Sequence, residues 1–288
     1  MESFMLELLQ AKRLTEVVDI GANPIDGEPP YKDMLHSGLC KVTGFEPQES
    51  ALAQLLQAKG EHERYLPYAV GDGKQHTLHI CRASGMTSLF EPDETVLSLF
   101  EILHSCSEVI EKIPLTTQRL DDIKEIEAID LLKIDIQGGE LSVFQNGSRL
   151  LAKAVCIQTE VSFLTLYKDQ PTLGDIDIEL RKQGFIPHCA AAIKNWPIAP
   201  FVSPNTPYQP LNQLLEADLV YVRDFSHPEL MDDEQLKHLA LIAQFCYGSI
   251  DLTMRCIMLL AERGTLQSDS LQRYTEALAT AVASVQSS

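Results

Sequence analysis

Acidic side chains recur where short apolar runs of this chain give way to turns. They are Asp19, Glu46, Asp72, Asp135 and Glu160. If the runs are parallel strands, their carboxyl ends meet at one edge of a sheet, and we expect the acids to gather there. Carboxylates in such a place can bind amines and hydroxyls, take up protons or hold cations.

The first acid, Asp19, begins the turn Asp19-Ile20-Gly21-Ala22-Asn23. Glycine in such a turn lets the backbone approach a ligand closely. No G-x-G-x-x-G pattern follows, and a carboxylate is a poor neighbour for a pyrophosphate, which needs uncharged donors. An acid here suits a ligand with an amino group, such as the methionine part of S-adenosylmethionine. A plain strand-to-helix turn accounts for the same residues.

The next two acids would complete a nucleoside site. Glu46, in Gly44-Phe45-Glu46-Pro47, can accept hydrogen bonds from both ribose hydroxyls at the end of the second strand. Asp72, in Gly71-Asp72-Gly73, ends the third strand and can face the adenine amino group. The alternatives are a solvated strand end for Glu46 and a simple turn for Asp72. No Lys-Ser or Lys-Thr pair follows Gly73, which excludes a phosphate loop.

The last two acids are candidates for catalysis. Asp135 follows a buried run and precedes Gly138-Gly139, and Glu160 ends the next run, so the two carboxylates should converge. Together they can accept a proton from an alcohol or hold Mg²⁺. In the structural alternative, Asp135 caps the turn and Glu160 is a solvated strand end. His188 follows a later strand and is a third candidate base, with surface or packing roles as its alternative.

These side chains require a sheet to position them. The pattern predicts strands at 16–20, 41–45, 65–70, 130–136, 154–159, 185–190 and 218–222, with helices at 49–59 and 171–183. Near-continuous apolar strands that alternate with helices indicate a parallel sheet covered on both faces. Residues 74–118 break the rhythm and predict an insertion with two strands at the sheet edge.

The chain changes character towards its C-terminus. Five prolines predict a long irregular loop over 194–215, which contains the single tryptophan, Trp196. Three helical patterns follow at 229–246, 249–263 and 267–285. We therefore predict an α/β domain over 1–225 and a helical region over 226–288. The helices either form a homo-oligomer interface or pack on their own sheet.

Composition narrows the classes of partner. The 288 residues include 23 Lys and Arg against 41 Asp and Glu, a net charge of −18. Such a field repels phosphate backbones and anionic membranes, which argues against nucleic acid as a partner. No apolar run reaches the roughly 18 residues of a membrane span. The 7 cysteines are scattered without a C-x-x-C pair, which favours a reducing cytoplasm over disulfides or zinc.

Five segments together resemble the FkbM family of S-adenosylmethionine-dependent methyltransferases. They are VVDIGAN, GFEP, AVGDG, LLKIDIQGGEL and the run that begins QTEVSF, in the order of that family and within about 14–224. The resemblance implies a Rossmann-like methyltransferase fold with a mostly parallel seven-stranded sheet. It also implies methyl transfer to a hydroxyl of a sugar, glycan or glycosylated metabolite.

The same resemblance assigns roles in cofactor binding. Asp19, Gly21 and Asn23 fall in the cofactor loop, Glu46 on the ribose and Asp72 near adenine. The chain departs from the family pattern in one place, because the glycine expected six residues after the aspartate is Ile25 here, and Gly27 follows two residues later.

Two other classes of function compete with this interpretation. A non-catalytic protein would keep the nucleotide pocket and use its helical tail for interaction. An NAD-dependent oxidoreductase would need the dinucleotide fingerprint that the chain lacks. The acceptor, the position methylated, the dependence on a metal and the oligomeric state are not encoded in any motif that we find.

Overall fold

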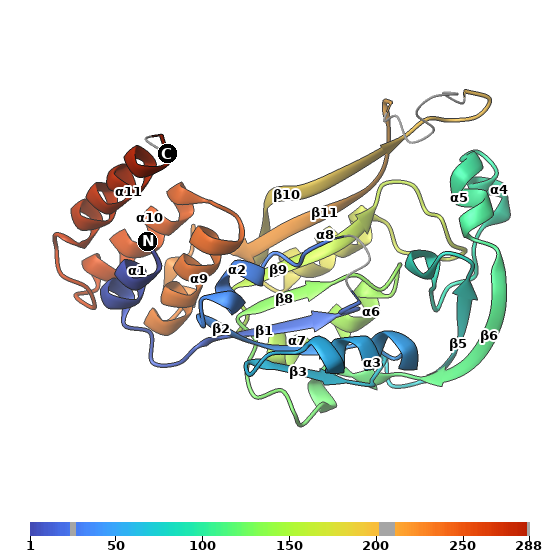
Figure 1. Ribbon diagram of the computed structural model, residues 1–288, viewed down its shortest axis with the longest axis horizontal. Coiled ribbons are helices and arrows are strands. Elements are labelled where there is room, and N and C mark those ends of the chain that lie inside the picture. The colour runs from blue at the N-terminus through green and yellow to red at the C-terminus, as the bar shows by residue number, and fades with distance from the viewer. Residues whose placement is uncertain (24–26, 202–210, 287–288) are drawn as a thin grey trace.

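A seven-stranded sheet runs through the middle of the computed structural model, which describes residues 1–23, 27–201 and 211–286 (Figure 1). The strand order is β10-β11-β9-β8-β1-β2-β3. The strands are β1 (Thr15–Ile20), β2 (Cys40–Phe45), β3 (Glu63–Leu66), β8 (Leu131–Ile134), β9 (Cys156–Ser162), β10 (Phe185–Trp196) and β11 (Gln213–Arg223). Four neighbouring pairs of strands are parallel, and β11 is antiparallel to both β9 and β10. The predicted mostly parallel sheet of seven strands is confirmed.

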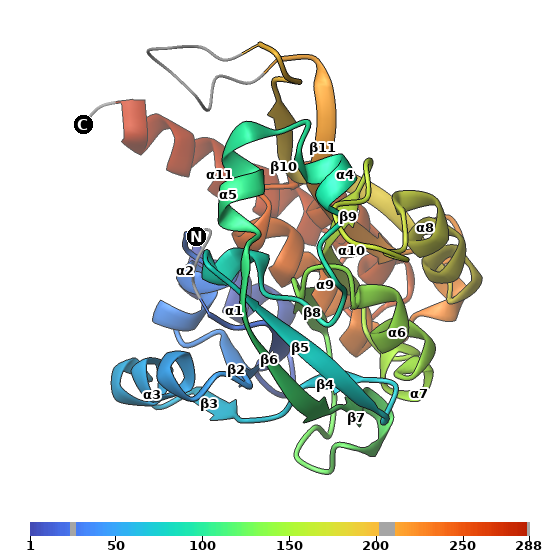
Figure 2. The ribbon, with the colours of Figure 1, turned by 90° about the vertical axis from the view of Figure 1, so that its right-hand side faces the viewer.

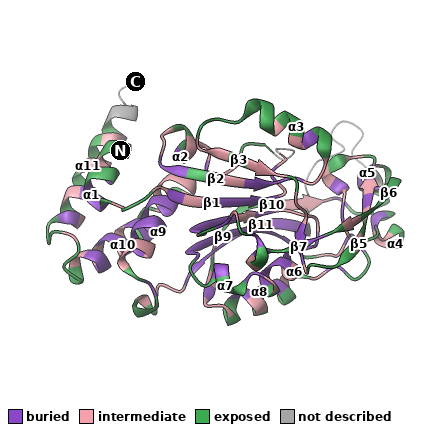
Figure 3. Cartoon of the chain, turned by 90° about the horizontal axis from the view of Figure 1, so that it is seen from below, coloured by how far each residue is buried: buried purple, intermediate pink, exposed green. Residues whose placement is uncertain are grey.

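Helices cover both faces of this sheet. One face carries α1 (Glu2–Leu9), α2 (Lys32–His36), α9 (Asp233–Cys246) and α10 (Ile250–Glu262). The other carries α6 (Glu140–Gln145), α7 (Ser148–Leu151) and α8 (Leu173–Lys182). Helix α3 (Glu49–Ala58) packs beside β3. Buried segments are concentrated in the central strands and in the inner sides of α9 and α10 (Figure 3). Burial on both faces explains why the strands are nearly continuous in apolar residues.

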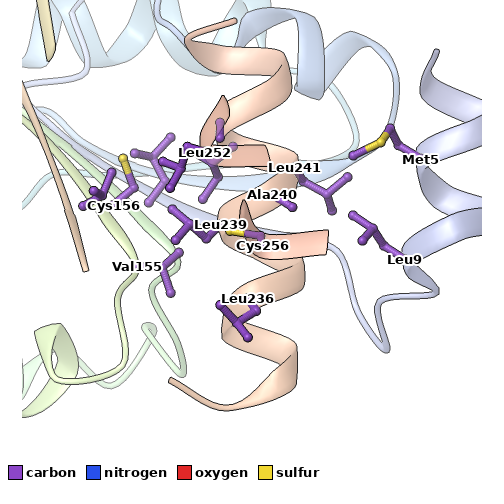
Figure 4. Packing of buried hydrophobic residues seen from close by; sticks show 14 of the residues in the cluster. Met5, Leu9, Val155, Cys156, Leu236, Leu239, Ala240, Leu241, Leu252 and Cys256 are labelled. Carbon is purple, nitrogen blue, oxygen red and sulfur yellow. The ribbon is translucent and has the colours of Figure 1, made fainter. Parts of the chain in front are cut away.

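The C-terminal helices share a core with the sheet. Leu239 of α9 and Leu252 of α10 pack in one cluster with Val155 and with Cys156 of β9 (Figure 4). A capping box starts α9, in which Asp232 and Gln235 exchange side-chain and backbone hydrogen bonds. Helix α11 (Ser270–Gln286) lies outermost, against α10. The division at 225 therefore marks a change of secondary structure inside a shared core, and a separate helical unit stays a prediction.

The insertion is an antiparallel hairpin with helices at its tip. Strands β5 (Gln75–Cys81) and β6 (Val109–Thr116) cross in front of the carboxyl ends of the parallel strands (Figure 2). Between them lie α4 (Glu94–Leu97) and α5 (Glu101–Cys106), two helices that the sequence analysis missed. Phe100, Leu97 and Leu166 form a separate small cluster there. The insertion thus forms a wall beside the sheet edge.

One strand prediction needs correction. The predicted strand 65–70 ends at Leu66, because Pro67 has no N–H to continue the ladder. Val70–Gly71 (β4) instead pairs with Gln118–Arg119 (β7) in a second small sheet. One-turn 3₁₀ helices lie at Ser84–Met86, Leu120–Asp122 and Pro228–Leu230.

The loop predicted over 194–215 is shorter than expected, because β10 continues to Trp196 and β11 begins at Gln213. Three register shifts in β10 accommodate this long antiparallel pair. Trp196 packs against the small cluster of the insertion. Three of the five prolines in this segment, 204, 207 and 210, lie outside the described residues. No helix in the described ranges is both long and apolar enough to cross a membrane.

Candidate functional site

A cavity of about 710 Å³ opens over the carboxyl ends of β1, β2 and β8. Asp19, Glu46 and Asp135 all line it, as do Gly21 and Asn23. Leu78 of β5 and Leu115 of β6 form part of the opposite wall. The sheet therefore brings three of the five predicted acids to one cavity of a size suited to a small organic ligand.

Asp19 lines the cavity, and one of its two carboxylate oxygens receives no hydrogen bond. Its side chain is buried, and Oδ2 accepts a hydrogen bond of 2.6 Å from the Tyr31 hydroxyl. Oδ1 makes no hydrogen bond, although the Lys133 ammonium lies 3.4 Å away. Burial raises the pKa of Asp19, and the nearby Lys133 opposes that rise. A buried acceptor without a hydrogen-bond donor is a place where a ligand amine would fit.

Gly21 is required by the crossing of two backbone segments. Its φ is +81°, and a Cβ at this position would lie 2.0 Å from the carbonyl oxygen of Asp135. The amides of Gly21 and Ala22 both donate to the Phe45 carbonyl at 3.1 Å. The turn after β1 is thus fixed directly against the loop after β8. Pro24 and Ile25, where the chain departs from the family pattern, lie outside the described residues.

Glu46, directly after β2, is the predicted ribose acceptor, and it lines the cavity. Its side chain is buried, and Oε1 accepts the Gln48 amide at 2.7 Å. Burial raises the pKa of Glu46, while backbone hydrogen bonds from Gln48 and Asn23 oppose the rise. Beyond it, the rings of Phe45 and Tyr68 stack with centroids 6.3 Å apart. Both rings line the cavity, which gives it an aromatic end.

Asp72 is not among the residues that line this cavity. Its Oδ1 lies 2.7 Å from His76 Nε2 and accepts the Thr117 hydroxyl at 3.1 Å. Partial burial raises its pKa, but the hydrogen bonds from His76, Lys74 and Thr117 outweigh burial and hold the pKa well below its usual range. The geometry supports the turn role of Asp72 and not a contact with adenine, because its carboxylate ties β4 to the insertion.

Asp135 and Glu160 converge through a third residue that the sequence analysis did not single out. Gln137 Nε2 donates to Asp135 Oδ1 at 3.0 Å and to Glu160 Oε2 at 2.8 Å. Asp135 is half-buried and lines the cavity, whereas Glu160 is buried behind Gln137 and does not line it. Asp135 is therefore the member of the pair that a ligand can reach.

Glu160 is held by a cation on its other side. Lys194 Nζ lies 3.0 Å from Glu160 Oε1 and 3.8 Å from Glu216 Oε2. Burial and the neighbouring carboxylates of Asp135 and Glu216 raise the pKa of Glu160 well above its usual range, which Lys194 only partly offsets. Glu160 is thus an electrostatically costly group whose charge depends on Lys194.

Carboxylate oxygens of Asp135, Glu140 and Glu160 lie within 4.8 Å of one another, at the predicted Mg²⁺ position. Glu140 Oε1 already accepts the amides of Ile136, at 2.8 Å, and Gly138, at 3.3 Å. Both oxygens of Glu160 accept hydrogen bonds from side chains. Mg²⁺ needs several free oxygen lone pairs in a near-octahedral arrangement. This set of residues does not fit the ion, and the Mg²⁺ prediction is not supported.

His188 lies far from this cavity, contrary to expectation. It is part of β10, level with the middle of the sheet, and its Nε2 is 2.8 Å from the Ser249 hydroxyl before α10. Burial lowers the pKa of His188, which a distant Asp251 partly opposes. The structure does not support His188 as a base, because His188 lies inside β10, faces the helical layer and does not line the cavity.

Four site residues were missed in the sequence analysis. They are Tyr31, Lys133, Gln137 and Lys194. Lys133 carried a usable signal, because it is the only charged residue within the apolar run 131–134. Gln137 precedes two glycines, and nothing in that pattern distinguishes a bridging side chain from a turn residue.

No curated protein matches the chain in sequence. Among solved structures, the magnesium protoporphyrin IX methyltransferase of Synechocystis PCC 6803 with bound S-adenosylmethionine is similar at 13% identity and a TM-score of 0.38 over 77% of each chain. The precorrin-6y C5,15-methyltransferase of Geobacter metallireducens GS-15 is similar at 11% identity and a TM-score of 0.36, over 77% of this chain and 86% of that one.

A protein-family model also matches the sequence of this chain. The model of the methyltransferase FkbM domain matches residues 19–187. That range begins at Asp19 and includes Glu46, Asp135 and Glu160, the acids on which the resemblance rested. It covers more than half of the 288 residues. The chain belongs to the FkbM methyltransferase family.

Proposed function

We propose that this protein is an S-adenosylmethionine-dependent O-methyltransferase that acts on a hydroxyl of a sugar, glycan or glycosylated metabolite. One observation carries the proposal: a single cavity joins the uncommitted Asp19 oxygen, the buried Glu46 and the accessible Asp135. The three acids correspond to the amine, the ribose and the proton of the reaction. The saccharide part of the proposal comes from the family resemblance alone.

The residues present fit the cofactor. Asp19 Oδ1, a buried oxygen that receives no hydrogen bond although Lys133 lies 3.4 Å away, would accept from its amino group, and the buried Glu46 would accept from its ribose. The acids around the cavity favour a positively charged ligand. When bound, S-adenosylmethionine supplies a methyl group on a sulfonium, so that transfer to an alcohol forms a C–O bond and releases a neutral thioether.

Asp135 would take the proton of the acceptor hydroxyl. An alcohol is a poor nucleophile while it is protonated, so a positioned base lowers the barrier. Asp135 Oδ1 is bound by Gln137, and within the described residues its Oδ2 has no hydrogen-bond donor. The proton moves to this carboxylate as the C–O bond forms and the C–S bond of the sulfonium breaks. Protons and charges balance in this step without a metal ion.

Titration calorimetry with S-adenosylmethionine and with NAD tests the cofactor. We expect binding of S-adenosylmethionine alone, and binding of NAD alone would overturn the proposal in favour of an oxidoreductase. Mass spectrometry of candidate glycans and metabolites then tests transfer. Cofactor binding without a methyl gain in any hydroxylated acceptor would favour the non-catalytic alternative.

Two further parts of the proposal concern the cellular location and the oligomeric state of the protein. All seven cysteines are free thiols, which supports a cytoplasmic location. A homo-oligomer through the C-terminal helices is confined to α11, because α9 and α10 turn their apolar residues to the sheet. Light scattering of the full chain and of a chain that ends before Ser270 tests this. Equal oligomeric mass in both would remove the interface.

A further inference from the structure

Gln137 has a backbone conformation that its residue type rarely adopts. Its φ is +57°, in the left-handed region, between β8 and α6. Such a conformation costs of order 1–3 kcal/mol at a non-glycine residue and persists where surrounding contacts enforce it. Gln137 also lines the cavity beside Asp135. The question is what its side chain does there that a glycine would not.

The side chain uses its whole hydrogen-bonding capacity. Both Nε2 hydrogens are directed to carboxylates, one on Asp135 and one on Glu160. The Tyr167 hydroxyl lies 2.9 Å from Gln137 Oε1 and 3.1 Å from the Met86 carbonyl, and either can accept its hydrogen. The Gln137 carbonyl accepts the Ser88 hydroxyl at 2.6 Å. Three segments distant in sequence, around Ser88, Glu160 and Tyr167, therefore fix this one residue.

The orientation of the amide follows from the charges around it. Rotation by half a turn would place Oε1 against the Asp135 and Glu160 carboxylates, where only acceptors face it. Burial raises the pKa of Tyr167 well above its usual range, so its hydroxyl stays a donor to Oε1. The amide has one satisfied orientation as long as both acids are ionised.

We propose, on the basis of the function above, that Gln137 is a positioning residue that holds Asp135 to accept the proton. The amide is neutral, so it orients Asp135 without cancelling the negative charge that a base needs. Two lysines lie near these acids. Lys194 contacts the far oxygen of Glu160 and is separated from Asp135 by the amide. Lys133 interacts electrostatically with Asp135 but is paired with Asp19. Glu160 serves as an anchor, and Asp135 Oδ2 remains directed to catalysis.

Nuclear magnetic resonance of the side-chain amide tests the network without an acceptor. The resonances of Gln137 are assigned by their loss in Gln137→Met, and those of the exposed Gln145, at the end of α6, serve as control. We expect the Gln137 hydrogens to exchange with water more slowly than those of Gln145, and to shift in both Asp135→Asn and Glu160→Gln. Exchange as fast as at Gln145, or no shift in either variant, would overturn the proposal.

Kinetics separate positioning from a merely structural role. In Gln137→Met we expect kcat to fall on the order of 100-fold, the effect of a misplacement near 1 Å, with the KM for S-adenosylmethionine unchanged. Gln137→Glu keeps the shape of the side chain and adds a carboxylate to those of Asp135, Glu140 and Glu160. The pH at which kcat reaches half its plateau should therefore rise. Gln145→Glu is the matched control and should leave both values unchanged. A uniform loss of kcat at every pH in Gln137→Glu would contradict positioning.

Failure of this inference differs from failure of the proposed function. An amide that behaves as expected in a chain that binds no S-adenosylmethionine keeps the network and removes the methyltransferase proposal. Methyl transfer at a native rate in Gln137→Met keeps the enzyme and removes Gln137 from its mechanism. If Gln137→Met does not fold, the isosteric Gln137→Glu alone decides by its pH profile.

Discussion

Strand β8 has an acid next to each of its ends, and the two acids differ in how their carboxylates are bonded. Asp130, just before the strand, is bound by Arg13 through both oxygens, and its Oδ2 also accepts the Glu16 amide at 2.8 Å. Asp135, just after the strand, receives a hydrogen bond from one neutral amide and faces the cavity. The first carboxylate is saturated by a cation, and the second keeps an oxygen for a ligand.

This contrast separates structural from functional acids within one strand. A saturated ion pair ties the N-terminal segment to the sheet, and His238 of α9 lies 3.9 Å from the same carboxylate. Removing a partner there leaves a charge without compensation. An unsaturated acid contributes little to folding and can exchange protons. Stability should therefore depend on Asp130, and chemistry on Asp135.

The largest effect is expected on kcat, from substitution of Asp135 at the end of β8 that faces the cavity. Asp135→Asn should lower kcat by roughly 10²–10⁴-fold, the range for loss of a general base. Its free energy of unfolding should stay near that of the native chain, because Asp135 forms no ion pair among the described residues and Lys133 keeps its pairing with Asp19. Steady-state rates and urea denaturation measure the two quantities. Near-normal turnover in both Asp135→Asn and Glu160→Gln would remove the acidic pair from the mechanism.

Substitution of Asp130, at the opposite end of β8, should change the stability of the fold. Asp130→Ala should lower the free energy of unfolding by about 3 kcal/mol, since a largely buried pair loses one partner while Arg13 still reaches solvent. Urea denaturation measures the loss, and Asp122→Ala, at an exposed ion pair, is the control. Affinity for S-adenosylmethionine should not change in the folded fraction. A stable Asp130→Ala variant with weakened binding would reverse the comparison.

Glu46 tests whether a second cavity acid is functional. Glu46→Ala should weaken S-adenosylmethionine by about 1.5–3 kcal/mol, the cost of a lost charge-assisted hydrogen bond. Calorimetry measures the affinity, with the exposed Glu49→Ala as control. Unchanged affinity would show that the ribose assignment is wrong.

Glu140 sharpens the comparison through pH. Burial raises the pKa of Glu140 to about 7, and backbone amides only partly oppose it. The folded state then binds this proton more tightly than the unfolded state, so stability falls as pH rises from about 5 to 8. Relative to Glu140→Gln, the native chain should lose about 2 kcal/mol over that range. A constant difference between the two chains across the range would contradict the shift.

The smallest expected effect concerns metal. Because nitrogen donors already occupy the acid cluster, treatment with EDTA should leave the methyl transfer rate unchanged. Restoring Mg²⁺ or Mn²⁺ should add nothing. A rate that falls in EDTA and recovers with Mg²⁺ would show that the acids at this end of β8 are saturated by a metal, as Asp130 is by Arg13.

The sequence predicted the sheet well because its strands are marked locally. The predicted strands 16–20, 41–45 and 130–136 correspond to β1, β2 and β8, and the acids at their carboxyl ends reach one cavity. Pro67 was a visible break that the predicted strand 65–70 ignored. The short helices α4 and α5 were missed, since four to six residues carry too little periodicity.

Non-local contacts explain the remaining errors. His188 was misplaced because the end of β10 depends on pairing with β11, which no local pattern records. The roles of Gln137 and Lys194 depend on partners in other strands, so their residue types alone did not reveal them. Asp72 resembled a strand-end ligand in sequence, and only its hydrogen bonds to His76 and Thr117 assign it to the turn.

The irregular register of β10 has a consequence for how this protein can vary in length. Lys194 stands opposite Glu216 and reaches Glu160, and register shifts interrupt β10 on both sides of Ala191. Side chains alternate between the two faces of a strand, so gain or loss of one residue moves all later side chains to the other face. A single deletion between His188 and Lys194 would point the ammonium away from Glu160. Substitutions in this exposed stretch are tolerable, but insertions and deletions are not.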